Sequence, residues 1–312
     1  MISVESVTKR YGDLTAVADL SFQVDQGEVV GFLGPNGAGK TTTMKMLTGT
    51  LEPDQGTVLF DGSPISADLR EAKGRVGYLP ESNPLYDEMI AAEYLGFVSD
   101  LRGLSRPQAR KAISDAVAET GIEEVFLRPI GELSKGYRQR LGLAGAILHQ
   151  PEILILDEPT EGLDPNQRVE IRRLVAELGK ERTVLLCTHV MQEVEATCSR
   201  LLILNRGKLV AQGSVQELMA TRSGRARYVV EGVGQGISET LLALPGVESH
   251  RREEMEGRDR VLLEVTGEDD LRPKIFSLAQ EQGWVLWELH RERASLEDVF
   301  RKLTSERGEV EA

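Results

Sequence analysis

The sequence predicts an α/β fold for residues 1–220 and a small α+β domain for residues 225–312. Short apolar runs alternate with helical patterns in the first part. Such runs are typical of strands buried in a mostly parallel sheet with helices on both faces. A polar segment at Thr221–Gly224 then interrupts the pattern. The predicted elements after it follow the order βαββαβ, which is typical of a ferredoxin-like module. A length of 312 residues fits two domains of this kind.

Six apolar runs are the main predicted strands of the first domain. The six runs are Val29–Leu33, Thr57–Phe60, Arg75–Tyr78, Ile153–Leu156, Val184–Cys187 and Leu201–Leu204. Helical patterns dominate from about residue 84 to 150, which predicts a helical subdomain inserted between strands of the core. A further helix is predicted after Asp164, because Asp164 suits an N-cap, Pro165 the first turn and Gly179 the stop.

The second domain is predicted from alternating strand and helix patterns. Its strands are expected at Arg227–Glu231, Val247–Arg251, Arg260–Thr266 and Trp284–His290, and its helices at Ser238–Leu244 and Leu271–Gln282. A last helix is predicted from Ser295, which forms a start resembling a capping box with Asp298. Its apolar face favours packing on its own domain.

The composition narrows the possible partners. Asp and Glu number 50 against 37 Lys and Arg, giving a net charge of −13. An acidic chain repels phosphate backbones, so we expect no nucleic-acid partner. The sequence has no apolar stretch long enough for a transmembrane helix and no signal peptide at its start. Any membrane role is therefore expected to act through another chain. The two cysteines, Cys187 and Cys198, are expected to be buried thiols in a reducing cytosol.

A phosphate-binding loop is the clearest chemical motif. The pattern G-x-x-x-x-G-K-[ST] is matched by Gly34-Pro35-Asn36-Gly37-Ala38-Gly39-Lys40-Thr41, followed by Thr42. The motif follows a predicted strand and opens a helical segment, Lys40–Leu47, which is the context it needs. Glycines let backbone N–H groups surround phosphate oxygens. Lys40 would place its charge at the β- and γ-phosphates, and Thr41 would offer a hydroxyl to Mg²⁺.

Two carboxylates form the second motif. Asp157 and Glu158 directly follow the apolar run Ile153–Leu156. The carboxyl end of a strand in an α/β sheet is where ligands bind. Asp157 is therefore a candidate for the shell of Mg²⁺, and Glu158 a candidate to polarise an attacking water. Acidic residues after strands are common, so this motif gains its weight from the phosphate loop.

Together with three further motifs, these residues make the chain similar to the ATP-binding subunit of an ABC transporter over about residues 1–220. Leu133-Ser134-Lys135-Gly136-Tyr137 resembles the ABC signature, and Gly162-Leu163-Asp164-Pro165 resembles the D-loop. His189 resembles the switch histidine, and Tyr11 the aromatic residue that stacks on adenine. The resemblance implies a P-loop NTPase core with antiparallel N-terminal strands and a helical subdomain.

The resemblance also assigns roles, each with a plain alternative. Ser134 and Gly136 would present a hydroxyl and a backbone N–H to a γ-phosphate, and the alternative is an ordinary helix cap. His189 would contact the γ-phosphate and hold Glu158 and water in line, and the alternative is a strand-end histidine satisfied by the core. Tyr11 would stack on adenine, and the alternative is aromatic packing.

Two departures from the family pattern involve charge. Glu81 stands where the family usually has Gln, and a carboxylate there is still a candidate ligand for Mg²⁺. Lys135 replaces Gly in the signature. These departures, with the C-terminal domain, resemble an exporter subgroup that serves drug, lipid, sodium or gliding-motility systems.

The resemblance implies an ATP hydrolase that uses ATP and Mg²⁺. One phosphate loop and one signature per chain imply a dimer with an identical or paralogous subunit that closes around two ATP. Glu158, His189 and Lys40 are the expected catalytic residues. Export would go through a separate transmembrane permease docked near Glu81–Leu104, so the chain is expected in the cytoplasm, peripheral on the inner face of the membrane. Two alternatives stay open: a soluble ABC ATPase that regulates a non-transport machine, and a nucleotide-gated binding module without useful turnover.

Overall fold

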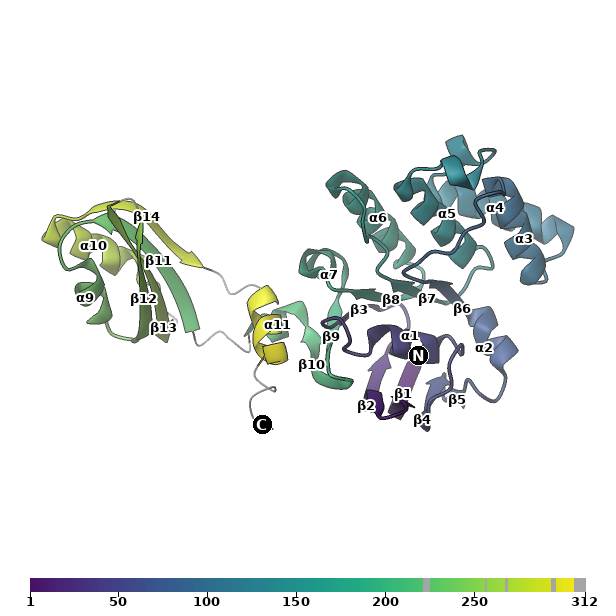
Figure 1. The fold of residues 1–312 in the computed structure, drawn as a ribbon, viewed down its shortest axis with the longest axis horizontal. Helices are drawn as coiled ribbons and strands as arrows, with labels where there is room; N and C mark the ends of the chain where they lie inside the picture. The colour runs from purple at the N-terminus through teal and green to yellow at the C-terminus, as the bar shows by residue number, and fades with distance from the viewer. Residues whose placement is uncertain (221–224, 256, 267–268, 293–295, 306–312) are drawn as a thin grey trace. The chain divides into compact units, whose positions relative to one another are not determined.

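A computed structural model of the chain describes residues 1–220, 225–255, 257–266, 269–292 and 296–305. The chain divides into two compact units (Figure 1). One holds residues 1–215 together with the described residues from 303 on, and the other holds residues 216–302. The domain limits expected from the sequence stay a prediction.

A six-stranded sheet forms the centre of the first unit. Its strand order is β10-β9-β3-β8-β7-β6, and all neighbours are parallel except β10, which runs antiparallel to β9. The strands are β3 (Val29–Leu33), β6 (Val76–Leu79), β7 (Ile153–Asp157), β8 (Thr183–Thr188), β9 (Arg200–Asn205) and β10 (Lys208–Ser214). β7 and β8 are buried at every position. Five of the predicted apolar runs lie in this sheet, shifted by at most one residue at either end.

A second sheet is antiparallel and contains the N-terminal strands. Its order is β2-β1-β4-β5, with β1 (Ile2–Tyr11), β2 (Leu14–Val24), β4 (Gln55–Phe60) and β5 (Ser63–Pro64). The run Thr57–Phe60 therefore belongs to an antiparallel sheet, although its apolar character is equally typical of the parallel one.

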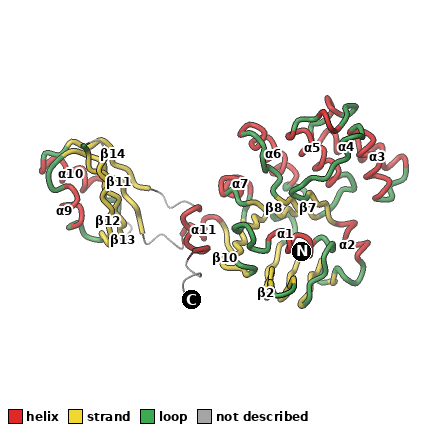
Figure 2. Tube along the Cα trace, viewed as in Figure 1, coloured by secondary structure: helices red, strands yellow, loops and turns green. Residues whose placement is uncertain are grey.

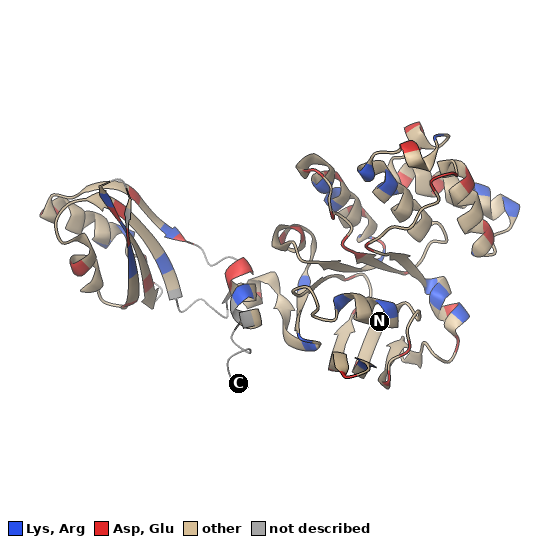
Figure 3. Cartoon of the chain, in the orientation of Figure 1, with Lys and Arg blue, Asp and Glu red and all other residues tan. Residues whose placement is uncertain are grey.

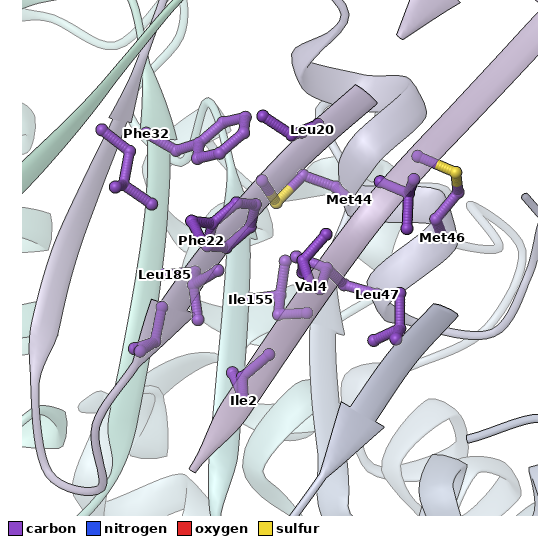
Figure 4. Close-up of a cluster of buried hydrophobic side chains, with 14 of the residues drawn as sticks. Ile2, Val4, Leu20, Phe22, Phe32, Met44, Met46, Leu47, Ile155 and Leu185 are labelled. Carbon is purple, nitrogen blue, oxygen red and sulfur yellow. The ribbon is translucent and has the colours of Figure 1, made fainter. Parts of the chain in front are cut away.

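Helix α1 (Lys40–Leu47) lies between the two sheets and shares their apolar core (Figures 1 and 4). Figure 4 shows Met44, Met46 and Leu47 of α1 among side chains from both sheets, such as Phe22 and Leu185. Because this core packs on α1, the start of the helix is fixed at the carboxyl end of β3.

Three helices form the expected helical subdomain and pack on one another (Figure 2). They are α3 (Ala91–Leu101), α4 (Arg106–Thr120) and α5 (Lys135–Ile147), with short 3₁₀ turns at Glu123–Val125 and Ile130–Glu132. Asn83 ties the preceding loop to α5, because its Nδ2 donates to the Arg138 carbonyl oxygen at 2.8 Å. The signature-like segment thus opens a helix that is braced on the loop after β6.

Three further helices of the first unit lie between successive strands of the chain. They are α2 (Leu69–Arg75), α6 (Pro165–Leu178) and α7 (Met191–Thr197), and α8 (Val215–Ala220) follows β10. The predicted start and stop of α6 are confirmed. The Asp164 side chain accepts from the Gln167 backbone N–H at 2.9 Å, Pro165 is the first helical residue and Gly179 is the C-cap.

The second unit has an antiparallel four-stranded sheet in the order β12-β13-β11-β14. Its elements are β11 (Arg225–Val233), α9 (Ile237–Leu242), β12 (Val247–Met255), β13 (Arg258–Thr266), α10 (Arg272–Gln282) and β14 (Val285–Glu292). Helix α11 (Leu296–Ser305) follows, and its residues from Leu303 on are counted with the first unit. The predicted βαββαβ order is confirmed. Its core joins the sheet to α9 and α10. Ser295, the expected start of the last helix, lies outside the described residues.

Charged residues of both signs are interspersed on the helices in the view of Figure 3. In the described part of the chain, no helix is long and apolar enough to cross a membrane.

Candidate functional site

A cavity of about 710 Å³ opens where the loops after β3, β7 and β8 meet. These loops follow the carboxyl ends of adjacent parallel strands, the usual ligand-binding edge of an α/β sheet. The cavity is lined by Tyr11, Leu14, Thr15, Ala16, Asn36, Gly37, Ala38, Gly39, Lys40, Thr41, Thr42, Glu81, Asp157, Glu158, Glu161, His189 and Arg206. Most of the predicted site residues thus come together.

The phosphate loop takes a backbone shape that its glycines permit. Gly37 and Gly39 have φ angles of 79° and 99°, in the region that side chains disfavour. A Cβ on Gly39 would lie 2.5 Å from the Ala16 carbonyl oxygen. Gly39 is the N-cap of α1 and supplies no side-chain acceptor, so the first amides of the helix are left for another acceptor.

Lys40 lies inside this loop and is only 8% exposed. Its Nζ donates to the carbonyl oxygens of Gly34 at 2.8 Å and Pro35 at 3.3 Å. The carbonyl oxygens of Gly34 and Pro35 therefore hold the Lys40 ammonium group in place, and neither residue lines the cavity. The ammonium group and the helix N-terminus give this end of the cavity a positive character suited to phosphate.

Asp157 is a buried carboxylate at the carboxyl end of β7. Its side chain is 1% exposed, and neither carboxylate oxygen has a hydrogen-bond partner at ordinary distance. Cys187 pairs with Asp157 across β7 and β8, and its thiol is a weak donor whose pKa is raised by burial and then by the Asp157 charge. A buried carboxylate without donors is costly unless a cation compensates it.

The donor set fits Mg²⁺ held together with phosphate oxygens and water. Thr41, Asp157 and Glu81 all line the cavity. Among the described residues, no three His, Cys, Asp or Glu side chains are close enough to form a metal cage by themselves. Mg²⁺ is usually bound through one or two carboxylates plus substrate phosphates, so this incomplete set is what such a site needs.

Glu158 and His189 form a pair at the cavity wall. His189 Nδ1 lies 2.9 Å from Glu158 Oε2, and the His189 backbone N–H donates to the same oxygen at 3.4 Å. Glu158 has a φ angle of 50°, which is rare for a residue with a side chain and is common at functional sites. Its own N–H donates to the Cys187 carbonyl oxygen at 2.8 Å, so β8 holds the strained residue in place.

Glu81 lies near three other acidic residues. Burial raises its pKa, and the nearby charges of Glu161, Asp157 and Glu158 raise it further. This cluster makes the Glu81 end of the cavity negative. Glu161 lines the cavity but was not expected from the sequence, because it falls between two motifs and belongs to neither.

The outer wall of the cavity comes from β1, β2 and the turn after β9. Tyr11 ends β1 and is 49% exposed, which leaves its ring open for stacking. Thr15, Ala16 and Arg206 also line the cavity without having been predicted. The Gly207 N–H donates to the Ala38 carbonyl oxygen at 3.0 Å, which fixes the Arg206 turn on the phosphate loop. Such positions follow from tertiary packing and carry no local sequence signal.

Ser134 and Gly136 do not line the cavity of their own chain. Ser134 is the N-cap of α5 and accepts from the Tyr137 N–H at 3.3 Å, so it opens a helix as expected. A Cβ on Gly136 would meet the Gln167 side chain at 3.0 Å, and one on Gly162 would meet Lys135 Nζ. The signature-like segment therefore packs beside the D-loop-like segment.

Comparisons with known proteins agree with this arrangement. A family model described as ABC transporter matches residues 17–161. The chain is 38% identical over 310 residues to "Nod factor export ATP-binding protein I" of Burkholderia orbicola, covering 97% of this chain and 96% of that protein. It is 41% identical over 218 residues to "Uncharacterized ABC transporter ATP-binding protein YxlF" of Bacillus subtilis, covering 70% and 72%. A solved structure of cbiO1 from Clostridium perfringens, titled part of the ABC transporter complex cbiONQ, matches with a TM-score of 0.64 and 31% identity over 70% of this chain and 90% of that one.

Proposed function

Because the chain belongs to the ABC transporter family, as an ATP-binding and ATP-hydrolysing subunit, we propose that Glu158 activates the water that cleaves ATP in this cavity. The observation that carries the proposal is the 2.9 Å contact of Glu158 Oε2 with His189 Nδ1 in the cavity that the phosphate loop also lines. A carboxylate held in one orientation is what a general base needs.

The triphosphate would lie along the loop from Asn36 to Thr42, with Lys40 near the β- and γ-phosphates. The uncapped amides at the start of α1 support this placement. Tyr11 would stack on the adenine ring at the outer wall, as its exposure and its position at the end of β1 allow.

Thr41, Asp157 and Glu81 are the residues that would hold Mg²⁺. Bound there, the ion would supply positive charge to phosphate oxygens. The unpartnered oxygens of Asp157 support the proposal for that residue.

Hydrolysis then needs little covalent chemistry from the protein. A water oxygen forms a bond to the γ-phosphorus as the bond from that phosphorus to the bridging oxygen of ADP breaks. Glu158 takes the proton that the water loses. His189 keeps Glu158 in line through their contact, and Lys40 stabilises the charge that develops on the phosphate oxygens.

We propose that Ser134 and Gly136 serve the cavity of a second copy or of a paralogue. The support is that neither residue lines the cavity of its own chain. The Ser134 hydroxyl and the first amides of α5 therefore do not face that cavity. Two cavities would then be completed by two signatures. ATP would favour the closed dimer, and hydrolysis would remove that preference.

The proposed task is to drive export through a separate membrane permease. The support is the relative named for Nod factor export, which the chain matches along almost its whole length. Closure would reach the permease through the segment from Glu81 to Leu104, which Asn83 anchors on α5. The protein would then lie in the cytoplasm, at the inner face of the membrane.

The test is Glu158→Gln. We expect kcat for ATP hydrolysis to fall at least about 100-fold, because a positioned base contributes that much or more, while Mg–ATP binding is retained. Glu152→Gln is the matched control, since Glu152 directly precedes β7 at its opposite end and pairs with Arg75. Parental turnover by Glu158→Gln would refute the assignment.

A further inference from the structure

Glu193 is a buried carboxylate that the proposed mechanism leaves unused. It lies in α7, is 2% exposed, and does not line the nucleotide cavity. Burying a carboxylate is costly unless hydrogen bonds satisfy it. The position and partners of this side chain therefore need an explanation.

Both oxygens of Glu193 accept hydrogen bonds from threonine hydroxyls on two different segments. Thr160 Oγ1 donates to Oε1, and Thr188 Oγ1 donates to Oε2 at 3.0 Å. Thr188 Oγ1 also accepts from the Val190 N–H at 3.1 Å. Both threonines are buried, so these hydrogen bonds are shielded from competing water.

These two segments are the ones that carry the reacting pair. Thr160 comes two residues after Glu158, and the Glu161 N–H donates back to the Glu158 carbonyl oxygen at 3.1 Å. Thr188 and Val190 flank His189, so the hydrogen bonds fix the backbone on both sides of the histidine. Glu193 therefore joins the turn after β7 to the turn after β8.

We propose that Glu193 is a positioning residue that sets the contact between Glu158 and His189. The proposal rests on the proposed function, since it matters only if that pair acts on water. Glu193 does not line the cavity, so it would not contact the nucleotide or the attacking water itself. It acts by holding the two turns at the separation that gives the 2.9 Å contact. This clamp of Glu193, Thr160 and Thr188 also links the D-loop-like segment to His189, because the Leu163 N–H donates to the Thr160 carbonyl oxygen at 3.2 Å.

The experiment measures ATP hydrolysis and ATP binding for Glu193→Ala, Thr160→Val and Thr188→Val in the full chain. Small misplacement of reacting groups costs on the order of 10- to 100-fold in rate. We expect kcat to fall by that factor in Glu193→Ala, with the Kd for Mg–ATP changed by less than about 2-fold. Glu193→Gln keeps the size of the side chain and one acceptor oxygen, so its kcat should lie between those of the alanine variant and the parent.

Thr120→Val is the matched control. Thr120 is 1% exposed, and its hydroxyl donates to the Ala116 carbonyl oxygen within α4, away from the cavity. This variant should lower the melting temperature but leave kcat at the parental value. A purely structural Glu193 would behave in the same way. The two threonine-to-valine variants keep side-chain volume, so they test the clamp even where Glu193→Ala fails to fold.

The outcomes separate the two proposals. If Glu158→Gln is inactive while the Glu193, Thr160 and Thr188 variants keep the parental kcat, the clamp is refuted and the assignment of the base stands. Glu158→Gln at parental kcat would overturn the proposed function itself. If the clamp is right, Thr160→Val added to Glu193→Ala should cause little further loss, because the hydrogen bond that it removes is already gone.

Discussion

Two neighbouring glycines of the phosphate loop differ in what a side chain would meet. Gly37 faces open space, whereas a Cβ on Gly39 would lie 2.5 Å from the Ala16 carbonyl oxygen. Both have positive φ angles, which cost an alanine about 1 kcal/mol or more. Glycine is therefore required at position 39 for two reasons: its φ angle is positive, and the backbone of the loop packs closely on β2 there.

This difference predicts a difference in stability without nucleotide. Gly37→Ala should lower the free energy of unfolding by about 1 kcal/mol, from backbone strain alone. Gly39→Ala should lower it by a further 1–3 kcal/mol or so, because the surrounding backbone must move. Denaturant unfolding of the two variants measures this, and equal losses would show that the contact with Ala16 is unimportant.

His149 is a half-buried histidine with an unusually low pKa of about 4. Burial disfavours its charged form, and the charge of Arg102 adds to this, while its hydrogen bond to the Val76 carbonyl oxygen opposes both. The unfolded chain takes up a proton near pH 6.5. The contribution of His149 to the free energy of unfolding is therefore fully present above pH 6.5, and it is lost as the pH falls towards 4.

The expected loss is about 1 kcal/mol of unfolding free energy between pH 7 and pH 5.5. His149→Gln is the matched variant, because an amide can still donate to the Val76 carbonyl oxygen but does not titrate in this range. Denaturant titrations at several pH values should give a shallower pH dependence for His149→Gln. The same slope in both proteins would contradict the low pKa.

Elements differ in how far the sequence predicts them. β3, β7 and β8 are buried, so they read as apolar runs and were located to within one residue. The run ending at Phe60 was equally apolar, but it belongs to the antiparallel sheet, because apolar character says nothing about strand direction. The start of α6 was predictable because its cap is local chemistry between Asp164 and Gln167.

The site shows the same division between local and tertiary signals. Loop and strand-end motifs identify Lys40 and Asp157 directly, since the chemistry is in consecutive residues. Glu161, Arg206 and Glu193 carry no motif, and only packing between distant segments brings them to the site or its support. Sequence motifs therefore identify the groups that are proposed to react, but they miss the groups that hold those residues in place.

The capping of α2 gives a prediction for a single element. The Asp68 carboxylate accepts from the backbone N–H groups of Arg70 and Glu71, each at 2.9 Å. Asp68→Ala should lower the unfolding free energy by about 1 kcal/mol, since the cap is lost. Asp115→Ala, at an exposed position inside α4, should change it by less than about 0.5 kcal/mol. Thermal unfolding compares the two, and equal losses would refute the cap.

At the scale of the whole molecule, the proposed function places two halves of a nucleotide site on one chain, which does not bring them together. The cavity gathers the phosphate loop, the acidic residues and His189, while Ser134 opens a separate helix. ATP between two copies would unite the halves. The central claim is thus that Mg–ATP links the cavity of one copy to Ser134 of another.

Sedimentation of the Glu158→Gln protein tests this claim most directly, because the substitution would keep ATP intact. The account predicts a dimer in Mg–ATP and a monomer in Mg–ADP. Adding Ser134→Glu, which sets a carboxylate against the γ-phosphate, should abolish the dimer while each copy still binds ATP. A Glu158→Gln protein that stays monomeric with Mg–ATP bound, or that dimerises equally with Ser134→Glu, would contradict the account.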